Sequence, residues 1–348
     1  MKKGEFKHTI RQDFKELYQF YLSQEARDRL DRMGRVKRWI SLLVWLFKSL
    51  VQKLSPVRRI LLIISLLLFF SINISYEGDR IRTNMGLKTF SFLTILFILM
   101  LELKDKLLAR DELNAGRAVQ FALLPDSNPV LTGWDIWLFT RPANEVGGDL
   151  VDYLKLSDNR LGIALGDVAG KGLGAALLMA KLQATIRAIA PNYHSLAKFG
   201  KHLNEIFCRD GLPERFISLI YFELKAKTGT IRILNAGHLP PITIQNHSVK
   251  EMVHGTVALG LKRNIKYKEQ HVKLQPGGLF IAYSDGLTEA RNASDEFFGE
   301  KRLLEIVKLS ENLSMKEMGE RLIQEVDQFI GDAKVSDDLS LVFVKRSN

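Results

Sequence analysis

The chain is poor in cysteine: its 348 residues contain a single one, Cys208. One thiol excludes an intramolecular disulfide and a zinc site built from cysteines. It also excludes a cysteine-dependent phosphatase loop, because no arginine stands six residues after Cys208. The scarcity of thiols is consistent with a functional domain that faces a reducing cytoplasm.

Two nucleotide-binding signatures are also missing from the glycine-rich stretch at residues 161–180. Residues 166–171 are one residue too short for a P-loop, and Gly172 stands where serine or threonine is required. Gly170, Gly172 and Gly174 alternate without the wider second gap of the dinucleotide motif. The stretch does contain an apolar run, then Gly166-Asp167, then a helical run. This order predicts a strand, a tight turn and a helix, with a carboxylate placed to hold a hard cation or simply solvated.

Positive charge is concentrated near the beginning of the chain. Residues 1–59 carry 15 Lys and Arg against 6 Asp and Glu, so 9 of the net +11 charges lie there. A nucleic-acid-binding protein more often carries such charge on its folded domain. Here the charge precedes a hydrophobic segment, which is typical of the cytoplasmic flank of a membrane span. We therefore expect a membrane partner and no nucleic acid.

Two apolar runs, residues 60–74 and 87–103, are each near the minimum length that crosses a bilayer. A short polar loop joins them, and basic residues flank the pair on both sides. We predict a transmembrane helical hairpin over residues 58–103, with both ends in the cytoplasm, in a multi-pass protein of the inner cell membrane. The alternative for either run alone is a buried core helix.

The segments on either side of the hairpin are also predicted to be helical. Residues 1–57 are interpreted as a basic cytosolic arm that ends in an interfacial helix over 39–54, with a third span as the alternative. Residues 104–124 are expected to form a charged amphipathic linker that ends before Pro125. This linker can relay a signal, pair with a second copy as a homodimer, or serve as a plain spacer.

Residues 125–348 are expected to form one folded domain of the α+β class. Predicted strands cover residues 136–140, 161–165, 216–224, 230–234, 279–283 and 340–344. Predicted helices cover residues 175–190, 195–207, 301–309 and 315–330. Because strands and helices are grouped rather than strictly alternating, the pattern favours α+β layers over a doubly wound parallel sheet.

Four acidic sites in this domain share one design, an aspartate at the end of an apolar run beside glycine or another acid. They are Gly147-Gly148-Asp149, Gly166-Asp167, Ser284-Asp285-Gly286 and Asp337-Asp338. Each alone is an ordinary surface turn, but together they suggest carboxylates gathered at one edge of a sheet. Like charges that close repel one another unless cations neutralise them. Oxygen ligands suit Mg²⁺ or Mn²⁺ rather than zinc, and two such ions can support displacement at phosphorus.

The motifs in this order closely resemble the SpoIIE/RsbU-like branch of the PPM metal-dependent serine/threonine phosphatases. They are EVGGDLVDY (145–153), GDVAGKGLGAALLMA (166–180), NAGHLPP (235–241), YSDGLTEA (283–290), Phe298-Gly299 and DDLSLV (337–342), and QFALLP (120–125) matches the segment that opens the domain in that branch. The resemblance implies an αββα β-sandwich flanked by helices, preceded here by an all-helical membrane region. It also implies a centre of two Mn²⁺ or Mg²⁺ ions.

The same resemblance implies the roles of individual residues. Asp149, Asp167, Asp285 and Asp337 would be the catalytic metal ligands, with Asp167 bridging both ions and the Val168 carbonyl assisting. Asp152 and Asp338 would be structural, and His238 is expected to belong to a structural turn rather than to act in catalysis. A water activated by the two metals would attack phosphoserine or phosphothreonine directly, without a phosphoenzyme.

We therefore predict a membrane-anchored protein phosphatase whose catalytic domain lies in the cytoplasm. The resemblance implies a phosphorylated regulatory protein as substrate, such as an anti-sigma-factor antagonist. Diguanylate cyclases share Gly-Gly-Asp, but Leu150 and Val151 replace the expected Glu-Phe. Calcineurin-like phosphoesterases need several histidine ligands, which the seven histidines here do not supply. The remaining alternative is a membrane-tethered scaffold that binds a phosphoprotein without turnover.

Overall fold

The computed structural model describes residues 22, 24–70, 74–77, 80–83, 85–210 and 215–347. The chain divides into two compact units, Met1–Ala109 and Arg110–Asn348. Most of the helical arm expected at the beginning of the chain, residues 1–21 and 23, lies outside the described residues.

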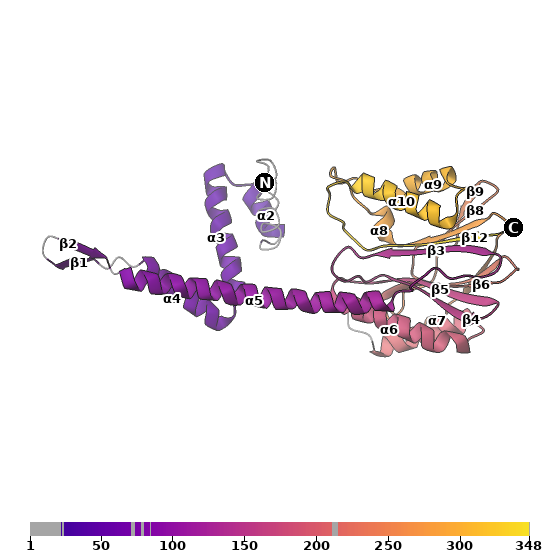
Figure 1. Cartoon of the computed structure of the whole chain (residues 1–348), viewed down its shortest axis with the longest axis horizontal. Helices are drawn as coiled ribbons and strands as arrows, with labels where there is room; N and C mark the ends of the chain where they lie inside the picture. The colour runs from indigo at the N-terminus through magenta and orange to yellow at the C-terminus, as the bar shows by residue number, and fades with distance from the viewer. Residues whose placement is uncertain are drawn as a thin grey trace. The chain divides into compact units, whose positions relative to one another are not determined.

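The first unit is built mainly from helices (Figure 1). They are α2 (Gln24–Asp31), α3 (Arg35–Lys53), α4 (Pro56–Phe70) and the first part of α5 (Met85–Leu123). Leu62 of α4 and Ile98 of α5 belong to one small buried cluster. Arg58 forms ion pairs of 2.6 Å with Glu102 and 2.7 Å with Asp105. Helices α4 and α5 therefore lie side by side.

Two local features of this unit differ from the expected elements. Helix α4 ends at Phe70, so Ile74 lies in a strand rather than at the end of the first apolar helix. Strands β1 (Ile74–Glu77) and β2 (Arg80–Thr83) pair antiparallel where only a polar loop was expected. As expected, the linker continues the second apolar run as a helix, and the two form α5, because residues 85–123 contain no proline to interrupt it.

Two described helices are long and apolar enough to cross a membrane, Gly86–Leu123 and Leu173–Asn192. The second contains α6 (Leu173–Ile189), whose residues Met179 and Leu182 are fully buried against the sheet of the second unit. It is therefore a core helix. Only 11% of the apolar window of the first helix is buried, so most apolar side chains in that window are not covered by the rest of the described structure.

The second unit is an αββα sandwich, which confirms the predicted fold class. One sheet has the order β10-β7-β6-β5-β4, and the other has the order β3-β12-β11-β8-β9. All of the strand pairs in both sheets are antiparallel. The strands are β3 (Trp134–Arg141), β4 (Leu150–Ser157), β5 (Arg160–Val168), β6 (Ile217–Lys225), β7 (Thr230–Ala236), β8 (Ile242–Gln245), β9 (Ser248–Glu251), β10 (Glu269–Lys273), β11 (Leu279–Tyr283) and β12 (Leu339–Arg346).

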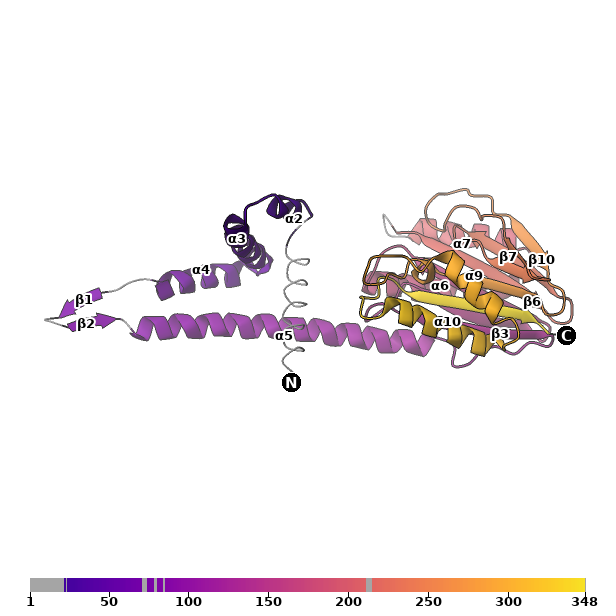
Figure 2. The same ribbon diagram turned by 90° about the horizontal axis from the view of Figure 1, so that it is seen from above.

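Helices cover the outer faces of both sheets, with α6 and α7 on one side and α9 and α10 on the other (Figure 1). Besides α6 they are α7 (Leu196–Asp210), the short α8 (Asp285–Thr288), α9 (Gly299–Leu309) and α10 (Met315–Ile330), with a 3-10 turn at Ala190–Asn192. Figure 2 shows α9 and α10 lying over the sheet that contains β12.

Three apolar layers hold the sandwich together. Phe222 and Phe280 meet between the two sheets, with ring centroids 4.8 Å apart. Phe199 of α7 packs on the first sheet, and Leu322 of α10 packs on the second. Because both sheets are buried on both faces, the direction of each side chain is fixed by strand alternation, and this direction places the candidate site.

Candidate metal centre

Strand alternation turns two aspartates of the first sheet toward the second sheet. On β5, Ile163 and Leu165 face inward, and alternation places Asp167 on the same side. Val151 of β4 also faces inward, and Asp149, two residues earlier, continues that face. Because β4 and β5 are antiparallel, the beginning of one and the end of the other lie at the same end of the sandwich.

The second sheet contributes two further aspartates. Tyr283, the last residue of β11, pairs with Leu341 near the beginning of β12, so the residues just beyond that pair share one edge. These residues are Asp285, which opens α8, and Asp337, which precedes β12. Gly286 allows this approach, because a Cβ there would lie 2.0 Å from the carbonyl oxygen of Asp338.

The four predicted carboxylates are close enough to alter one another's ionisation. Burial raises the pKa of Asp149 well above its ordinary value, and the neighbouring Asp167 charge adds to the effect. Burial also raises the pKa of Asp167 to about 6, with further contributions from Asp285 and Asp337. The pKa of Asp285 is raised by burial and by Asp337. Acids from four separate segments thus lie near enough to interact electrostatically.

Asp149 is the most enclosed of the four, at 6% exposed. Hydrogen bonds from Ser340 and Ser284 lower the pKa of its carboxyl group, but less than burial raises it. Its Oδ2 atom is buried without a hydrogen-bond partner. An orphaned carboxylate oxygen is costly, and it fits a ligand that awaits a cation. An all-oxygen donor set suits Mn²⁺ or Mg²⁺.

The carboxylates gather without forming a finished coordination sphere. Within the described part of the chain, no three Asp, Glu, His or Cys side chains converge tightly enough to hold one ion. At Asp337, the carboxylate accepts a 3.0 Å hydrogen bond from Lys171 Nζ. The same ammonium donates to the carbonyl oxygen of Ser336 at 2.7 Å. A divalent ion would therefore compete with Lys171 for Asp337.

Asp338 is engaged differently from its neighbour Asp337. Its carboxylate accepts hydrogen bonds from the backbone N–H of Ala143 at 2.7 Å and of Gly148 at 2.6 Å. These bonds fix the loop that leads into Asp149, which is the structural kind of role expected for Asp338. The same loop also lies close to the Val168 carbonyl, the expected backbone ligand. A Cβ built on Gly148 would be 3.1 Å from the Val168 oxygen.

Two other residues from the motifs lie away from this cluster or are sealed from solvent. Asp152 is buried and makes a two-pronged ion pair with Arg187 of α6, at 2.8 Å for each bond. The His238 Nδ1 atom is 2.9 Å from the Ser218 hydroxyl, and its Nε2 atom is buried without a partner. Burial lowers the pKa of His238 to about 4, so its ring is neutral at pH 7.

Gln120 was missed as a functional candidate by reasoning from residue types. The buried amide of this α5 residue donates to the Gly147 carbonyl at 2.7 Å and accepts from the Gly147 N–H at 3.0 Å. The loop before Asp149 is therefore held from one side by the end of α5 and from the other by Asp338. The only signal in the sequence was the position of Gln120 at the start of QFALLP.

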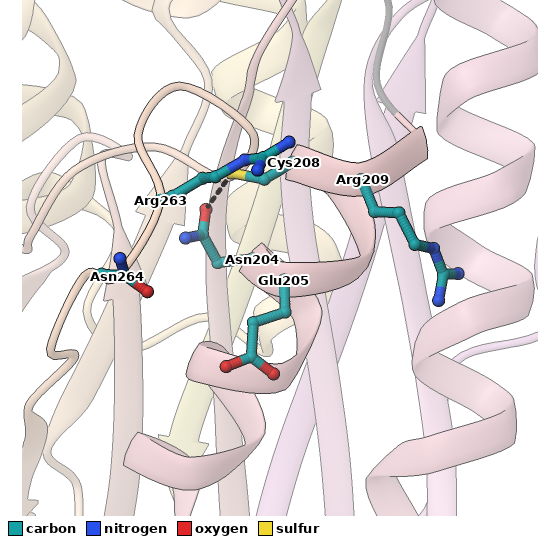
Figure 3. A pocket seen from close by; sticks show the side chains of 6 residues that line it. All are labelled: Asn204, Glu205, Cys208, Arg209, Arg263 and Asn264. Atoms are coloured by element: carbon teal, nitrogen blue, oxygen red, sulfur yellow. Dashed lines mark hydrogen bonds between the residues drawn. The ribbon is translucent and has the colours of Figure 1, made fainter.

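A separate cavity of about 200 Å³ opens beside α7 (Figure 3). Its lining residues are Asn204, Glu205, Cys208, Arg209, Arg263 and Asn264. None of the four aspartates reaches it. The Cys208 Sγ atom lies 3.6 Å from the Asn204 Oδ1 atom, so the single thiol is part of local packing there.

Comparison with known proteins agrees with this architecture. The family described as Stage II sporulation protein E (SpoIIE) matches residues 157–347. Protein IcfG of Synechocystis is 30% identical over 311 residues, which cover 80% of this chain and 48% of IcfG. This chain therefore spans about half the length of IcfG.

Two further comparisons extend the likeness. Phosphoserine phosphatase RsbU of Bacillus subtilis is 23% identical over 239 residues, covering 68% of this chain and 70% of RsbU. Among solved structures, the SiaA-PP2C domain of Pseudomonas aeruginosa superposes with a TM-score of 0.59 at 19% identity. That match covers 70% of this chain and 99% of the domain, so the two share a fold.

Proposed function

The chain belongs to the SpoIIE family, and from this premise we propose that it is a metal-dependent protein serine/threonine phosphatase. The observation that carries the proposal is the meeting of Asp149, Asp167, Asp285 and Asp337 at one end of the sandwich, with raised pKa values for the first three. Such a cluster needs positive charge to stay ionised, and a phosphate monoester needs positive charge to accept a nucleophile.

Two Mn²⁺ or Mg²⁺ ions would supply an activated water and would neutralise charge during in-line displacement at phosphorus. The groups that would hold them are the carboxylates of Asp149, Asp167, Asp285 and Asp337 and the carbonyl of Val168. Asp338 would keep the Asp149 loop in place through the Gly148 amide. His238 is buried and neutral, so proton transfer is assigned to solvent at the site rather than to this ring.

The proposed substrate is a phosphoserine or phosphothreonine on a regulatory protein. RsbU, which this chain matches over most of its length, is a phosphoserine phosphatase. An anti-sigma-factor antagonist is the kind of substrate that the resemblance implies. Asp285 and Asp337 are only partly buried, and partial exposure of the proposed site suits a protein substrate.

We further propose that residues 58–103 anchor the chain in the inner membrane as a helical hairpin, with the phosphatase domain in the cytoplasm. Apolar side chains on both helices are exposed, including Leu67 and Phe70 of α4 and Phe97 and Met100 of α5. Large exposed apolar surfaces mark contact with lipid or with another protein. The exposed Leu107 and Leu108 further along α5 are the proposed contact of a homodimer.

Phosphate release from phosphoserine proteins, with Mn²⁺ or with a chelator, tests the activity. The full-length protein should release phosphate only with the ion. Asp167→Asn or Asp285→Asn should lower the rate by more than about 100-fold, which exceeds the loss of activity seen when a residue that only supports a metal ligand is replaced. Asp158→Asn, at an exposed turn, is the matched control. Stable binding of the phosphoprotein without release under any of these conditions would support the scaffold alternative instead.

Membrane fractionation tests the anchor separately. The full-length chain should stay with membranes after an alkaline carbonate wash, which removes peripheral proteins. Replacing Leu67, Phe97 and Met100 by aspartate should release it, because charge within a span is costly. Release of the unmodified chain by the wash would refute the spanning hairpin.

A further inference from the structure

Arg215 lies against the glycine-rich turn that follows Asp167. A Cβ built on Gly170 would lie 3.0 Å from its Nη1 atom, and one built on Gly174 would lie 3.0 Å from its Nη2 atom. Any larger residue at either position would press on the guanidinium group. Two of the three alternating glycines therefore make room for an arginine, which explains a spacing that fits neither nucleotide motif.

The guanidinium group of Arg215 has no partner in the part of the chain that the structure describes. Among the residues that the structure describes, it forms no hydrogen bond or ion pair, and its Nη1 atom is buried without an acceptor. The first turn of α6, against which it packs, contains no acidic residue. A partly buried, unpaired charge is costly, and native proteins retain one where something outside the chain pairs with it.

The position of Arg215 connects it to the acidic site. The N–H of Ala169, two residues after Asp167, donates to the carbonyl of Phe216 at 2.9 Å, so the segment of Arg215 is hydrogen-bonded to this turn. From the same turn, Lys171 reaches Asp337. The unpaired guanidinium thus flanks the turn between the metal-ligand candidates and α6.

Exposed apolar side chains occur on the two segments that meet at this arginine, its own and the first turns of α6. Phe216 is 38% exposed, and Leu173 and Leu177, one helical turn apart on α6, are 46% and 64% exposed. A phosphorylated polypeptide fits these two features. Its phosphate can accept hydrogen bonds from the guanidinium group, and the residues beside the phosphate can pack on the apolar side chains.

We propose that Arg215 binds the phosphate group of the phosphoserine substrate next to the acidic site. This rests on the proposed phosphatase function. Arginine presents paired donors that match phosphate oxygens, so the contact would orient the phosphate without taking part in bond breaking. The apolar side chains of Leu173, Leu177 and Phe216 would receive residues beside the phosphoserine.

The test compares the full-length wild type with Arg215→Met, which keeps the packing over Gly170 and Gly174 but removes the charge. With Mn²⁺ present, the KM for a phosphoserine protein and the inhibition constant of inorganic phosphate should both rise about tenfold or more, the usual weight of a charge-assisted hydrogen bond. The kcat should change much less. Arg263→Met, which removes an exposed arginine at the α7 cavity, should change none of these values.

A second measurement does not depend on turnover. Inorganic phosphate should raise the thermal unfolding temperature of the Mn²⁺-loaded wild type, and this rise should be smaller in Arg215→Met. If phosphate stabilises both proteins equally, the proposal is wrong, even where the enzyme proves active. If only the inhibition by free phosphate changes and the KM for the phosphoprotein does not, the assignment to substrate is wrong. Should Arg215→Met fail to fold, Arg215→Lys replaces it, and wild-type values for that variant would refute the paired contact.

Discussion

At the scale of the residue, the site is defined by where each carboxylate can point. Asp149 and Asp167 are turned inward by strand alternation, and Asp338 is held by backbone amides before any ion arrives. Bringing carboxylates together in a buried place favours their protonated forms, which is why the pKa of Asp167 rises to about 6. The cost of assembling the site is therefore built into the metal-free protein.

This cost predicts an unusual dependence of stability on pH. Because the folded protein holds a proton on Asp167 more tightly than the unfolded chain does, the metal-free protein should lose stability as pH rises from about 4 to about 6. Asp167→Asn cannot titrate, so at pH 7 it should unfold a few degrees higher than the wild type. Thermal unfolding in a chelator, followed from about pH 4 to about pH 7, covers this window and measures the difference.

His238 contributes to the same pH profile with the opposite sign. Burial lowers the pKa of His238 to about 4 in the folded protein. As pH falls below the ordinary histidine pKa, the unfolded chain takes up a proton before the folded protein does, and stability drops. This contribution is the same in the wild type and in Asp167→Asn, so it cancels in their difference. Parallel pH profiles for the two proteins would contradict the electrostatic account of the site.

His238 itself should matter for folding rather than for chemistry. His238→Ala removes the contact with Ser218 and leaves a small cavity, which should cost about 1–3 kcal/mol of unfolding free energy. The kcat should fall far less than the ~10²-fold expected when a general acid or base is lost. Denaturant unfolding and steady-state kinetics on the same preparation separate the two effects, and a large fall in kcat at unchanged stability would reverse the assignment.

Residue types alone could locate the acids but could not distinguish their roles. Asp337 and Asp338 are adjacent and identical in kind, and only the resemblance separated them before the structure showed which one binds the backbone. Nothing in the sequence pointed to Arg215, because whether a side chain has a hydrogen-bond partner depends on the three-dimensional structure. The same holds for Ser284 and Ser340, which contact Asp149 from the opposite sheet.

At the scale of the element, long and strongly patterned segments were predictable. The strand at β5 and the helix at α10 follow clear periods of two and 3.6 residues. The strand β4 was not predicted, since its residues 150–157 do not alternate strictly between apolar and polar, and β8, β9 and β10 are too short to show a period. The helical linker expected after residue 103 continues the second apolar run within α5, because a change from apolar to charged residues alters the surroundings of a helix without ending it.

The end of α5 is the element most directly joined to the site. Gln120→Leu would leave the buried N–H and carbonyl of Gly147 unpaired, at a cost of about 1–3 kcal/mol for each group. The loop of Asp149 should loosen, and we expect Mn²⁺ affinity to fall about tenfold or more.

A matched variant separates this effect from general destabilisation. Gln183→Leu breaks the 2.6 Å bond from α6 to the carbonyl of Leu123, at the same end of α5, but does not touch the Gly147 loop. It should lower the unfolding temperature while leaving Mn²⁺ affinity unchanged. Isothermal titration of both variants provides the comparison, and equal losses of affinity would mean that Gln120 acts only through stability.

At the scale of the whole molecule, the chain joins a basic, apolar first unit to a sandwich of nearly balanced charge. The charge distribution and the layer architecture were accessible from composition and pattern, because both depend on many residues at once. The meeting of four distant acids was suggested by their shared setting and strengthened by the resemblance, but its geometry depends on the register of two sheets and was not accessible from the sequence. One continuous helix, α5, contains residues of both units and covalently links the proposed anchor to the second unit.

The central claim is that this end of the sandwich is built to hold divalent cations. Titration of Mn²⁺ into the metal-free full-length protein, followed by calorimetry, measures it most directly. We predict two ions bound per chain, with proton release as Asp167 ionises, and a loss of binding in Asp167→Asn but not in Asp158→Asn. Absence of Mn²⁺ and Mg²⁺ binding, or binding that Asp167→Asn leaves unchanged, would contradict the account.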